Sequence, residues 1–237
     1  MAACNEARVD GPQRAITSEI IRKNSLLAVM LGIAIVTSSG CISFMANMVR
    51  VIKGTDAPAE FDEFQNKKVA VVAGTPSGLN ADATGIIVSS HVHALLASHV
   101  KKIQMVSQEE VTRMIGDEPA DKLELSMLGK RLGADFVVVV DVADLKLREG
   151  QTLFKGFSNS SVAVYKVNDG SGAVFRKNLT NFTFPNTGVP VTDVDEATFH
   201  RFYLKEVAQR LARSFYPYDP TIDVAKDASI VSLQSFQ

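Results

Sequence analysis

A run of uncharged, mostly apolar residues near the N-terminus constrains this chain more than any other stretch. Leu26 to Val36 is apolar, and the basic residues Arg14, Arg22 and Lys23 precede it. An export signal has the same order, with a basic start followed by an apolar centre of about 7–15 residues. The run therefore predicts that the chain is directed to a membrane.

The run ends in Ser38, Ser39, Gly40 and Cys41. Small residues followed by a cysteine are typical of the lipobox of bacterial lipoproteins. The signal peptidase needs small side chains at the cleaved bond, and the cysteine thiol accepts a diacylglyceryl group. We therefore predict cleavage between Gly40 and Cys41, and lipidation of Cys41. The motif departs from the usual one at Ser38, where leucine is commonest.

Two alternatives stay open. No charged residue lies between Asn24 and Val49, which is long enough for a membrane-spanning helix of about 20 residues. The second half of that segment contains Thr37, two serines and Asn47, and it is too polar for a good span. A buried core helix fits less well, because Gly40 and the serines would interrupt its apolar face. Both the lipobox and the uncleaved anchor place the protein on a membrane.

The composition describes a globular protein. The 237 residues are 46% hydrophobic and 22% charged, with a formal net charge of -1. A near-neutral chain lacks the charge with which nucleic-acid binders release counterions, so we expect no nucleic-acid partner. The only cysteines are Cys4 and Cys41. Two cysteines are too few for a disulfide scaffold or a cysteine-rich zinc site, and cleavage before Cys41 would leave one.

The chain divides into four parts. Residues 1–40 form an N-terminal extension and signal peptide, and residues 41–66 form a tether, since GTDAPAEFDEF carries turn formers and acids without a strong period. We predict a globular α/β domain over residues 67–218. Pro217 and Pro220 end the last helix, and residues 219–237 read as a weakly ordered tail.

Within residues 67–218 the hydrophobic period changes repeatedly between that of strands and that of helices. KKVAVV and KIQMVS read as strands, and ADFVVVVDV reads as a strand covered on both faces because its first half is continuously apolar. A hairpin is expected around Asn168, Asp169 and Gly170. The predicted helices are residues 86–101, 107–114, 123–132 and 195–216. The order β-α-β-α-α-β-β-β-α predicts an α/β (α+β) fold, a mixed sheet with helices packed on it.

Two finer expectations concern which side chains face inward. After Asp141 the sequence alternates, which predicts that Ala143, Leu145 and Leu147 share one face. In the last helix six apolar residues recur at helical spacing and are predicted to face the core, whereas three basic residues are predicted to face solvent. The apolar set is Phe199, Tyr203, Leu204, Val207, Leu211 and Phe215, and the basic set is Arg201, Lys205 and Arg213.

The order of the predicted elements resembles that of small bacterial envelope lipoprotein domains. It consists of the strand KKVAVV, a long helix, the strand ADFVVVVDV, the hairpin VYKVNDGSGAVFRK and a closing helix. The landmarks SSGC, GQTLFKGF and ARSFYPYDP are similar to those of an uncharacterised bacterial lipoprotein family. The resemblance covers residues 41–220. It implies a fold similar to the TolB N-terminal domain, the curli-secretion lipoprotein and the lipoproteins that activate penicillin-binding proteins. It implies no catalytic residue.

Three groups of residues could carry chemistry. The loop GTPSGLNADATG lacks the endings of a phosphate-binding or dinucleotide-binding loop, so we interpret it as a plain connection between a strand and a helix. His91 and His93 diverge on a helix and cannot chelate one ion together, and His99 lies on the apolar stripe. Ser160 and Ser161 lack a nucleophile motif.

The third group consists of those two serines together with acidic residues. Asp141, Asp144 and Glu149 follow the buried strand, and carboxylates at a strand end can form an acid–base pair when they are held close. A solvated strand end is the commoner explanation. We therefore predict no catalytic residue, no metal site and no cofactor.

The sequence as a whole favours a membrane-anchored cell-envelope lipoprotein that acts as a non-catalytic binding or assembly module. Two alternatives are an envelope hydrolase using Asp141, Asp144 and His200, and a subunit of an oligomeric complex that pairs through exposed sheet edges. The expected partners are membrane lipid, through Cys41, and an envelope protein or a second copy of the chain. The expected location is the periplasmic side of the envelope at the outer membrane, with a single-pass N-terminal anchor as the alternative.

Overall fold

The structure is a computed structural model that describes residues 56–116, 124–169 and 172–222. Gly40, Cys41 and the apolar run before them lie outside the described residues. The described residues belong to one compact unit that begins at Asp56.

The predicted α+β fold and element order are confirmed, with one two-residue strand added after the first. The elements are β1 (Lys68–Thr75), β2 (Gly78–Leu79), α3 (Ala83–His99), β3 (Gln104–Met105), α4 (Gln108–Gly116), α5 (Leu125–Arg131), β4 (Phe136–Glu149), β5 (Leu153–Lys166), β6 (Ala173–Pro190), α6 (Glu196–Ala212) and a 3-10 turn, η1 (Arg213–Phe215). Ser107 caps α4, since its hydroxyl accepts a hydrogen bond from the Glu110 amide at 3.2 Å.

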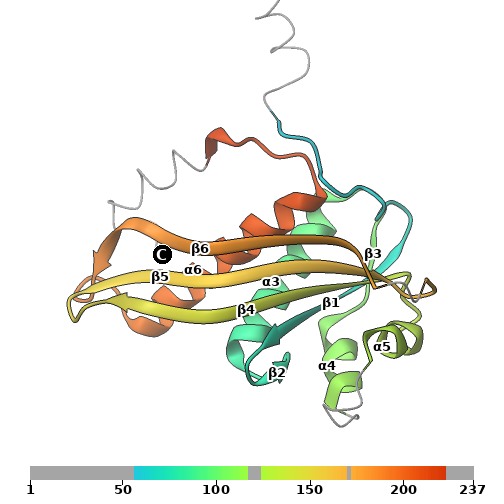
Figure 1. The fold of residues 1–237 in the computed structure, drawn as a ribbon, viewed down its shortest axis with the longest axis horizontal. Helices are drawn as coiled ribbons and strands as arrows, with labels where there is room; N and C mark the ends of the chain where they lie inside the picture. Colours follow the sequence, from blue (N-terminus) through green and yellow to red (C-terminus); the bar gives the residue numbers. More distant parts are fainter. Residues whose placement is uncertain (1–55, 117–123, 170–171, 223–237) are drawn as a thin grey trace, which may run out of the picture. The chain divides into compact units, whose positions relative to one another are not determined.

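The strands form one mixed, six-stranded sheet in the order β2-β1-β4-β5-β6 (Figure 1). β1 runs parallel to β4, and the short β3 pairs in parallel with the first residues of β1. β4, β5 and β6 form a long antiparallel meander, which extends well beyond the end of β1. The sheet therefore has a proximal half, where β1 and β4 begin and β5 ends, and a distal half made only of the meander.

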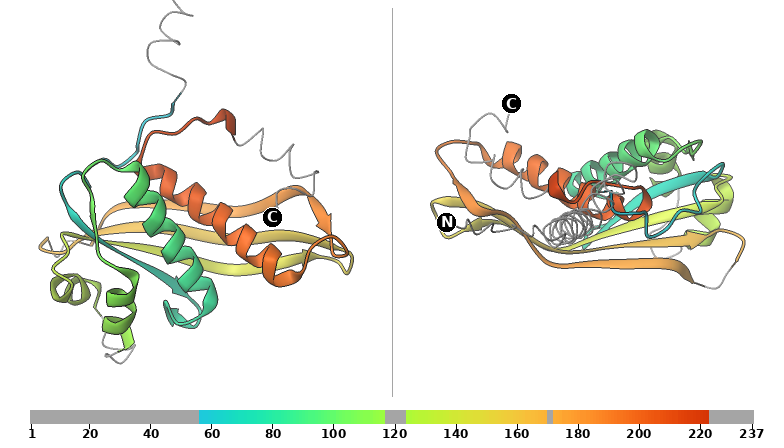
Figure 2. Two further views of the ribbon diagram at one scale, coloured as in Figure 1. Left: turned by 180° about the vertical axis from the view of Figure 1, so that it is seen from behind. Right: turned by 90° about the horizontal axis from the view of Figure 1, so that it is seen from above.

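The helices cover the two faces of the sheet unequally. α3 and α6 lie side by side over one face (Figure 2). This inner face carries Val138 and Val140 of β4, together with Val162 and Val164 of β5. α4 and α5 pack on the opposite, outer face, where Val137 and Val139 join their buried residues. Residues 136–140 are therefore buried on both sides, as their continuous apolar character predicts.

Two strand bulges shape the distal half. Asp144 and Asn181 both have positive φ, 53° in each case, and each lies at an irregularity in strand pairing. Asn159, on the strand between them, joins both: its amide group donates to Asp144 Oδ2 at 2.8 Å, and its Oδ1 accepts from the Asn181 amide at 2.8 Å. The bulge at Asp144 leaves Ala143 exposed, whereas Leu145 and Leu147 pack against the core. The prediction that these three share one face is wrong for Ala143.

The last helix begins where the sequence predicts, because the Asp195 carboxylate accepts a hydrogen bond from the Thr198 amide at 2.9 Å. The six apolar residues predicted to face inward are all buried. Arg201 and Lys205 are exposed as predicted, but Arg213 is 4% exposed. Its guanidinium lies over the ring of Tyr218 at 5.0 Å, because the chain turns back across it after η1.

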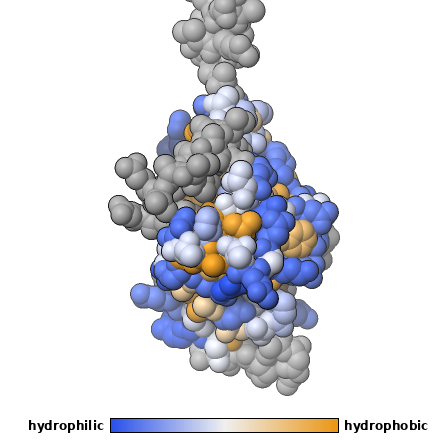
Figure 3. Space-filling model, turned by 90° about the vertical axis from the view of Figure 1, so that its left-hand side faces the viewer, coloured by the Kyte–Doolittle hydropathy of each residue, from blue (hydrophilic) through white to orange (hydrophobic). Residues whose placement is uncertain are grey.

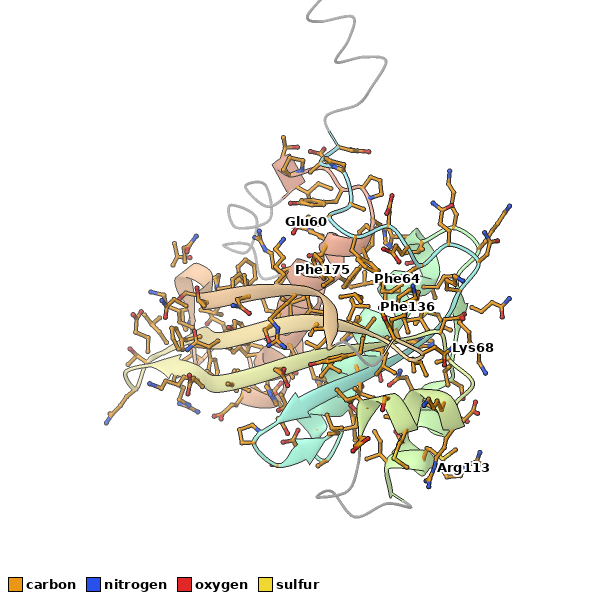
Figure 4. The ribbon with its side chains drawn as sticks, turned by 45° about the vertical axis from the view of Figure 1, so that its right-hand side comes forward. Glu60, Phe64, Lys68, Arg113, Phe136 and Phe175 are labelled. Atoms are coloured by element: carbon orange, nitrogen blue, oxygen red, sulfur yellow. The ribbon has the colours of Figure 1, made fainter. Side chains whose placement is uncertain are left out.

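The last part of the segment predicted to be a tether packs against the domain. Phe64 is fully buried and Phe61 is 8% exposed, and both rings contact Phe136 and Phe215 in a cluster of aromatic side chains (Figure 4). Ala57 exchanges two backbone hydrogen bonds with Tyr218, at 2.7 and 3.1 Å. Residues 56–66 therefore contribute to the core, because Phe61 and Phe64 turn inward between exposed acids.

Among the described residues, no helix combines the length and the hydropathy that a membrane crossing requires.

Candidate functional site

The two residues predicted for signal cleavage and lipidation, Gly40 and Cys41, lie outside the described residues. Their roles stay predictions. The other candidates from the sequence are all described, and their positions test whether any of them come together.

A pocket of about 330 Å³ opens where residues 56–66 meet the end of α3 and the turn after α6. Three chain segments that are far apart in the sequence form it. Its lining residues are Pro58, Ala59, Asp62, Gln65, His99, Val100, Lys101, Phe215, Tyr216 and Pro217. All three segments contribute apolar residues. The polar residues are Asp62 and Gln65 in the first segment, and His99 and Lys101 at the end of α3.

His99 and Tyr216 form one wall of this pocket. Their rings stack with centroids 4.2 Å apart and planes 17° from parallel. His99 Nδ1 lies 3.0 Å from the Leu95 carbonyl and 2.8 Å from the Ser98 hydroxyl, which fixes the ring on the helix. Burial raises the pKa of the Tyr216 phenol, so Tyr216 remains a neutral donor.

An apolar surface with a few polar groups around it can bind a small group that has an apolar body and a polar end. Asp62, Gln65 and Lys101 offer a carboxylate, an amide and an ammonium for that purpose. Of the residues that line the pocket, His99 is the one that the sequence marks as a candidate for chemistry. Nothing in the local pattern could reveal that Pro58 and Pro217, 159 positions later in the chain, line the same pocket.

The other histidines are dispersed over two helices. His91 and His93 are half-buried on α3, and burial lowers the pKa of each. Lys205 adds to the effect at His91, whereas the Val106 carbonyl opposes it at His93. Within the part of the chain that the structure describes, no group of three or more histidine, cysteine or acidic residues could hold a metal ion. The divergence predicted for His91 and His93 on a helix agrees with their placement on α3.

The acids after the buried strand and His200 lie on opposite sides of the sheet. Val140 and Val142 face α3 and α6, so Asp141 between them faces the other side. There its carboxylate lies against Gly74 of β1, at a place that a β-carbon on Gly74 would occupy. His200 is on α6, on the inner side, where its Nε2 lies 3.3 Å from the Thr84 hydroxyl. The sheet separates Asp141 from His200.

Asp144 is held by Asn159, and Glu149 forms an exposed ion pair with Lys155. Each of these carboxylates therefore has a structural partner on the meander. The arrangement does not bring Asp141 and Asp144 together with His200 as the hydrolase alternative requires, since an acid–base pair must lie within hydrogen-bond reach of one substrate.

The two serines also separate. Ser161 is half-buried on the outer face, whereas Ser160 is 5% exposed and faces α6. The Ser160 hydroxyl lies 3.1 Å from that of Ser158, which lies 2.9 Å from the Tyr203 hydroxyl; Tyr203 donates to the Phe182 carbonyl at 2.9 Å. This network is buried and joins α6 to β5 and β6. Burial raises the pKa of Tyr203, so it stays protonated as the donor that the network needs.

The loop between β1 and α3 is a connection, as interpreted from the sequence. Asp82 caps α3 by accepting from the Gly85 amide at 2.9 Å, and it also accepts from the Thr75 hydroxyl at 2.9 Å. Asn80 pairs with Ala73 through its backbone amide and through its side-chain oxygen, at 2.7 and 2.8 Å. These hydrogen bonds therefore fix the conformation of the loop.

No protein-family model matches the sequence, and no curated protein matches it. Several solved structures have a similar fold at low sequence identity. Lipoprotein GNA1162 from Neisseria meningitidis is 10% identical over 61% of this chain and 97% of its own, with a TM-score of 0.40. PelC from Paraburkholderia phytofirmans, crystallised as a dodecamer, is 12% identical over 66% and 88%, with a TM-score of 0.35.

The C-terminal domain of LpoB from Salmonella enterica is 13% identical over 49% of this chain and 84% of its own, with a TM-score of 0.33. GNA1162 is named a lipoprotein, and all three similarities have TM-scores of 0.40 or below. These similarities concern the fold alone and assign no site residue.

Proposed function

We propose that this protein is a lipid-anchored lipoprotein of the bacterial cell envelope, held by Cys41, whose domain binds a protein partner or another copy of itself without catalysing a reaction. The anchor is supported by the order of basic residues, apolar run, small residues and cysteine in the sequence. Firm attachment requires more than one acyl chain, and a multiply acylated cysteine would supply them.

The observation that carries the binding role is the open edge of the sheet at β6. This strand is 18 residues long and pairs with β5 on one side, and among the described residues no strand pairs with its other side. The first part of the edge carries exposed Arg176, Asn178 and Thr180. An edge strand offers unpaired backbone donors and acceptors to another chain, which is how strand addition binds peptides and subunits.

The non-catalytic role is supported by the placement of the reactive groups. Asp141 and His200 lie on opposite faces of the sheet, and Ser160 is taken up in a buried network with Ser158 and Tyr203. These groups stabilise the domain where they are. A protein that acts by binding a partner can do so through an open sheet edge, and β6 of the meander provides one.

The location that we propose is the periplasmic side of the envelope, at the outer membrane. The alternative is a single-pass anchor formed by the uncleaved apolar run. The two differ in one respect that can be measured, the covalent state of Cys41, whereas the binding role of β6 is the same in both.

Site-specific photocrosslinking tests the binding role in the native membrane. A photoreactive amino acid replaces Asn178 or Thr180 on the β6 edge, and matched probes replace Arg201 and Lys205, which are exposed on α6. We expect one crosslinked species of defined mass from the β6 probes and none from the α6 probes. A species of twice the chain's mass identifies a second copy as the occupant. Equal crosslinking from both surfaces, in variants with wild-type melting temperatures, would contradict the role of the β6 edge.

A further inference from the structure

Cationic side chains gather at the proximal end of the domain, where β1 and β4 begin and where β5, α3 and α5 end. We call this surface the lysine end. It consists of Lys67, Lys68, Lys101, Lys102, Lys130, Arg131 and Lys166. All of them except Lys68, which is half-buried, are exposed.

Backbone contacts place these residues on one continuous surface. The Asn66 amide donates to the Lys102 carbonyl at 3.2 Å, which joins the end of α3 to the start of β1. The Lys68 ammonium donates to the Leu132 carbonyl at 2.7 Å, which joins β1 to the end of α5. Lys166 is the pairing partner of Phe136 at the start of β4. Figure 4 shows Lys68 at this end, close to the start of β4 marked by Phe136.

Few carboxylates balance this surface. Asp62, Glu63, Asp135 and Asp169 are the acids near it, and the Asp135 carboxylate accepts a hydrogen bond from the Lys68 amide at 2.8 Å. The ion pairs found among the described residues involve none of Lys67, Lys101, Lys102, Lys130 or Lys166. These five lysines are exposed, so they give the lysine end an excess of positive charge in contact with solvent.

The distal end of the domain carries charges of both signs. Its acids include Asp144, Asp193 and Asp195, whereas Glu149 and Glu196 form ion pairs with Lys155 and Arg148. Figure 3 views the molecule from that end and shows a surface that is hydrophilic for the most part, with small separate apolar spots. The excess of positive charge therefore lies at the lysine end, although the whole chain has a formal net charge of only -1. A charge excess at one end orients a protein beside a charged surface.

The described chain also enters the domain at its proximal end. Ala57 pairs with Tyr218, and the Glu60 and Phe61 amides donate to the Ser214 carbonyl at 2.8 and 3.0 Å. Phe64 then packs against Phe136 at the start of β4. Fifteen residue steps separate Cys41 from Asp56, so a fully extended link would span at most about 50 Å. Arg50 and Lys53 are the only charged residues within that link.

We propose that the lysine end docks on the anionic phospholipid headgroups of the membrane that holds the Cys41 anchor. This proposal rests on the proposed anchor. Each lysine or arginine close to an anionic membrane contributes roughly fivefold to binding, equivalent to about 1 kcal/mol. The link keeps the domain at a high effective concentration beside the bilayer, so a weak charged surface suffices. Docking this way directs the distal end away from the headgroups, and the β6 edge runs from the membrane toward that end.

Lysine acetylation in vesicles tests the proposal on the full-length, lipidated protein. The protein is reconstituted in vesicles of phosphatidylcholine alone, and in vesicles that also contain about one third phosphatidylglycerol. A brief pulse of acetylating reagent is followed by mass spectrometry of each lysine. In anionic vesicles we expect acetylation of Lys67, Lys101 and Lys102 to slow several-fold, and acetylation of the exposed Lys146 and Lys205 to stay unchanged. At high salt the slowing should disappear.

A charge-reversed variant sharpens the test. In Lys101→Glu/Lys102→Glu, protection of Lys67 and Lys130 should be lost, whereas Lys205→Glu on α6 should leave it intact. Lys130→Glu/Lys166→Glu provides a second, independent reversal on a different pair of elements should the first one unfold. Equal acetylation rates in both vesicle types, for a protein that floats with the vesicles, would overturn the docking surface and leave the anchor standing. Failure of the protein to float would overturn the anchor and this proposal together.

Discussion

The two halves of the sheet differ in whether helices cover one face or both. In the proximal half, α3 and α6 cover one face and α4 and α5 cover the other, so every residue from Phe136 to Val140 is buried. Among the described residues, no helix covers the outer face of the distal half, where Lys146, Phe157 and Thr183 lie side by side across the three strands. Stability therefore concentrates in the first half.

The largest difference is expected when a charge is introduced into each half. Val138 is fully buried and lies between Val71 and Val164 in the sheet. Val138→Asp would bury an unpaired carboxylate, at a cost of several kcal/mol against a total stability of about 5–15 kcal/mol. We expect no cooperative unfolding transition by circular dichroism for this variant.

The matched control is Ala143→Asp on β4 in the distal half, where the alanine is exposed. This change should shift the melting temperature by only a few degrees. Comparable loss of structure in both variants would show that the two halves do not differ in burial.

The next effect concerns residues 56–66, which extend the inner face of the proximal half. Phe64→Ala removes a fully buried ring that contacts Phe136 and Phe215, and should destabilise the domain by about 3–5 kcal/mol. Gln65→Ala, at the exposed neighbour, should change stability by less than about 0.5 kcal/mol. Urea denaturation measures both. Identical midpoints would mean that the segment is a tether throughout, as the sequence predicts.

A smaller effect tests how the distal half is held from one side. Gly156 lies under the ring of Tyr203, and a β-carbon there would overlap the ring. Gly156→Ala should destabilise by about 1–3 kcal/mol through overpacking. Gly116→Ala is the control, because nothing lies within 4 Å of a β-carbon at the end of α4. A Gly156 variant as stable as the control would show that α6 sits less tightly on β5 than the structure indicates.

The smallest effect is a dependence of stability on pH. Burial lowers the pKa of His91, His93 and His200 below the ordinary value of 6.5, although Asp82 and Glu196 partly oppose this at His200. The unfolded chain therefore binds protons at a higher pH than the folded chain does. The stabilisation is complete above about pH 6.5 and is lost as the pH falls toward the lowered values.

The urea midpoint should accordingly be lower at pH 5.5 than at pH 7.5. A variant with all three histidines replaced by glutamine should show a smaller difference between the two pH values. Two further variants divide the pH dependence between the histidines. One restores His200 alone on α6, and the other restores His91 and His93 together on α3. An unchanged pH dependence in the triple variant would contradict the role of these side chains.

The same contrast explains what could be predicted from the sequence. Continuous apolar residues identify β4 because both faces are buried there, and helical spacing identifies the buried side of α6. The sequence predicts the distal half less well, because the bulge at Asp144 shifts the alternation by one residue and places Leu145 and Leu147 on the opposite face from Ala143. The alternation of apolar and polar residues along a strand does not show where a bulge interrupts it.

The pocket and the inward turn of residues 56–66 were also beyond the sequence. Phe61 and Phe64 stand among acids in AEFDEF, so their composition resembles that of a linker, and only the contacts with Phe136 reveal their burial. His99 and Tyr216 are 117 positions apart and meet only through the packing of α3 beside α6. Such long-range contacts leave no local signal.

The central claim is that Cys41 carries the membrane anchor from which the domain acts. Mass spectrometry of the N-terminal peptide of the mature protein, purified from membranes, tests it most directly. We expect a chain that begins at Cys41 and carries the mass of a diacylglyceryl group, and an unacylated precursor in Cys41→Ser. A mature chain that retains residues 24–40, with an unmodified thiol at Cys41, would rule out the lipid anchor and favour the uncleaved membrane-spanning anchor.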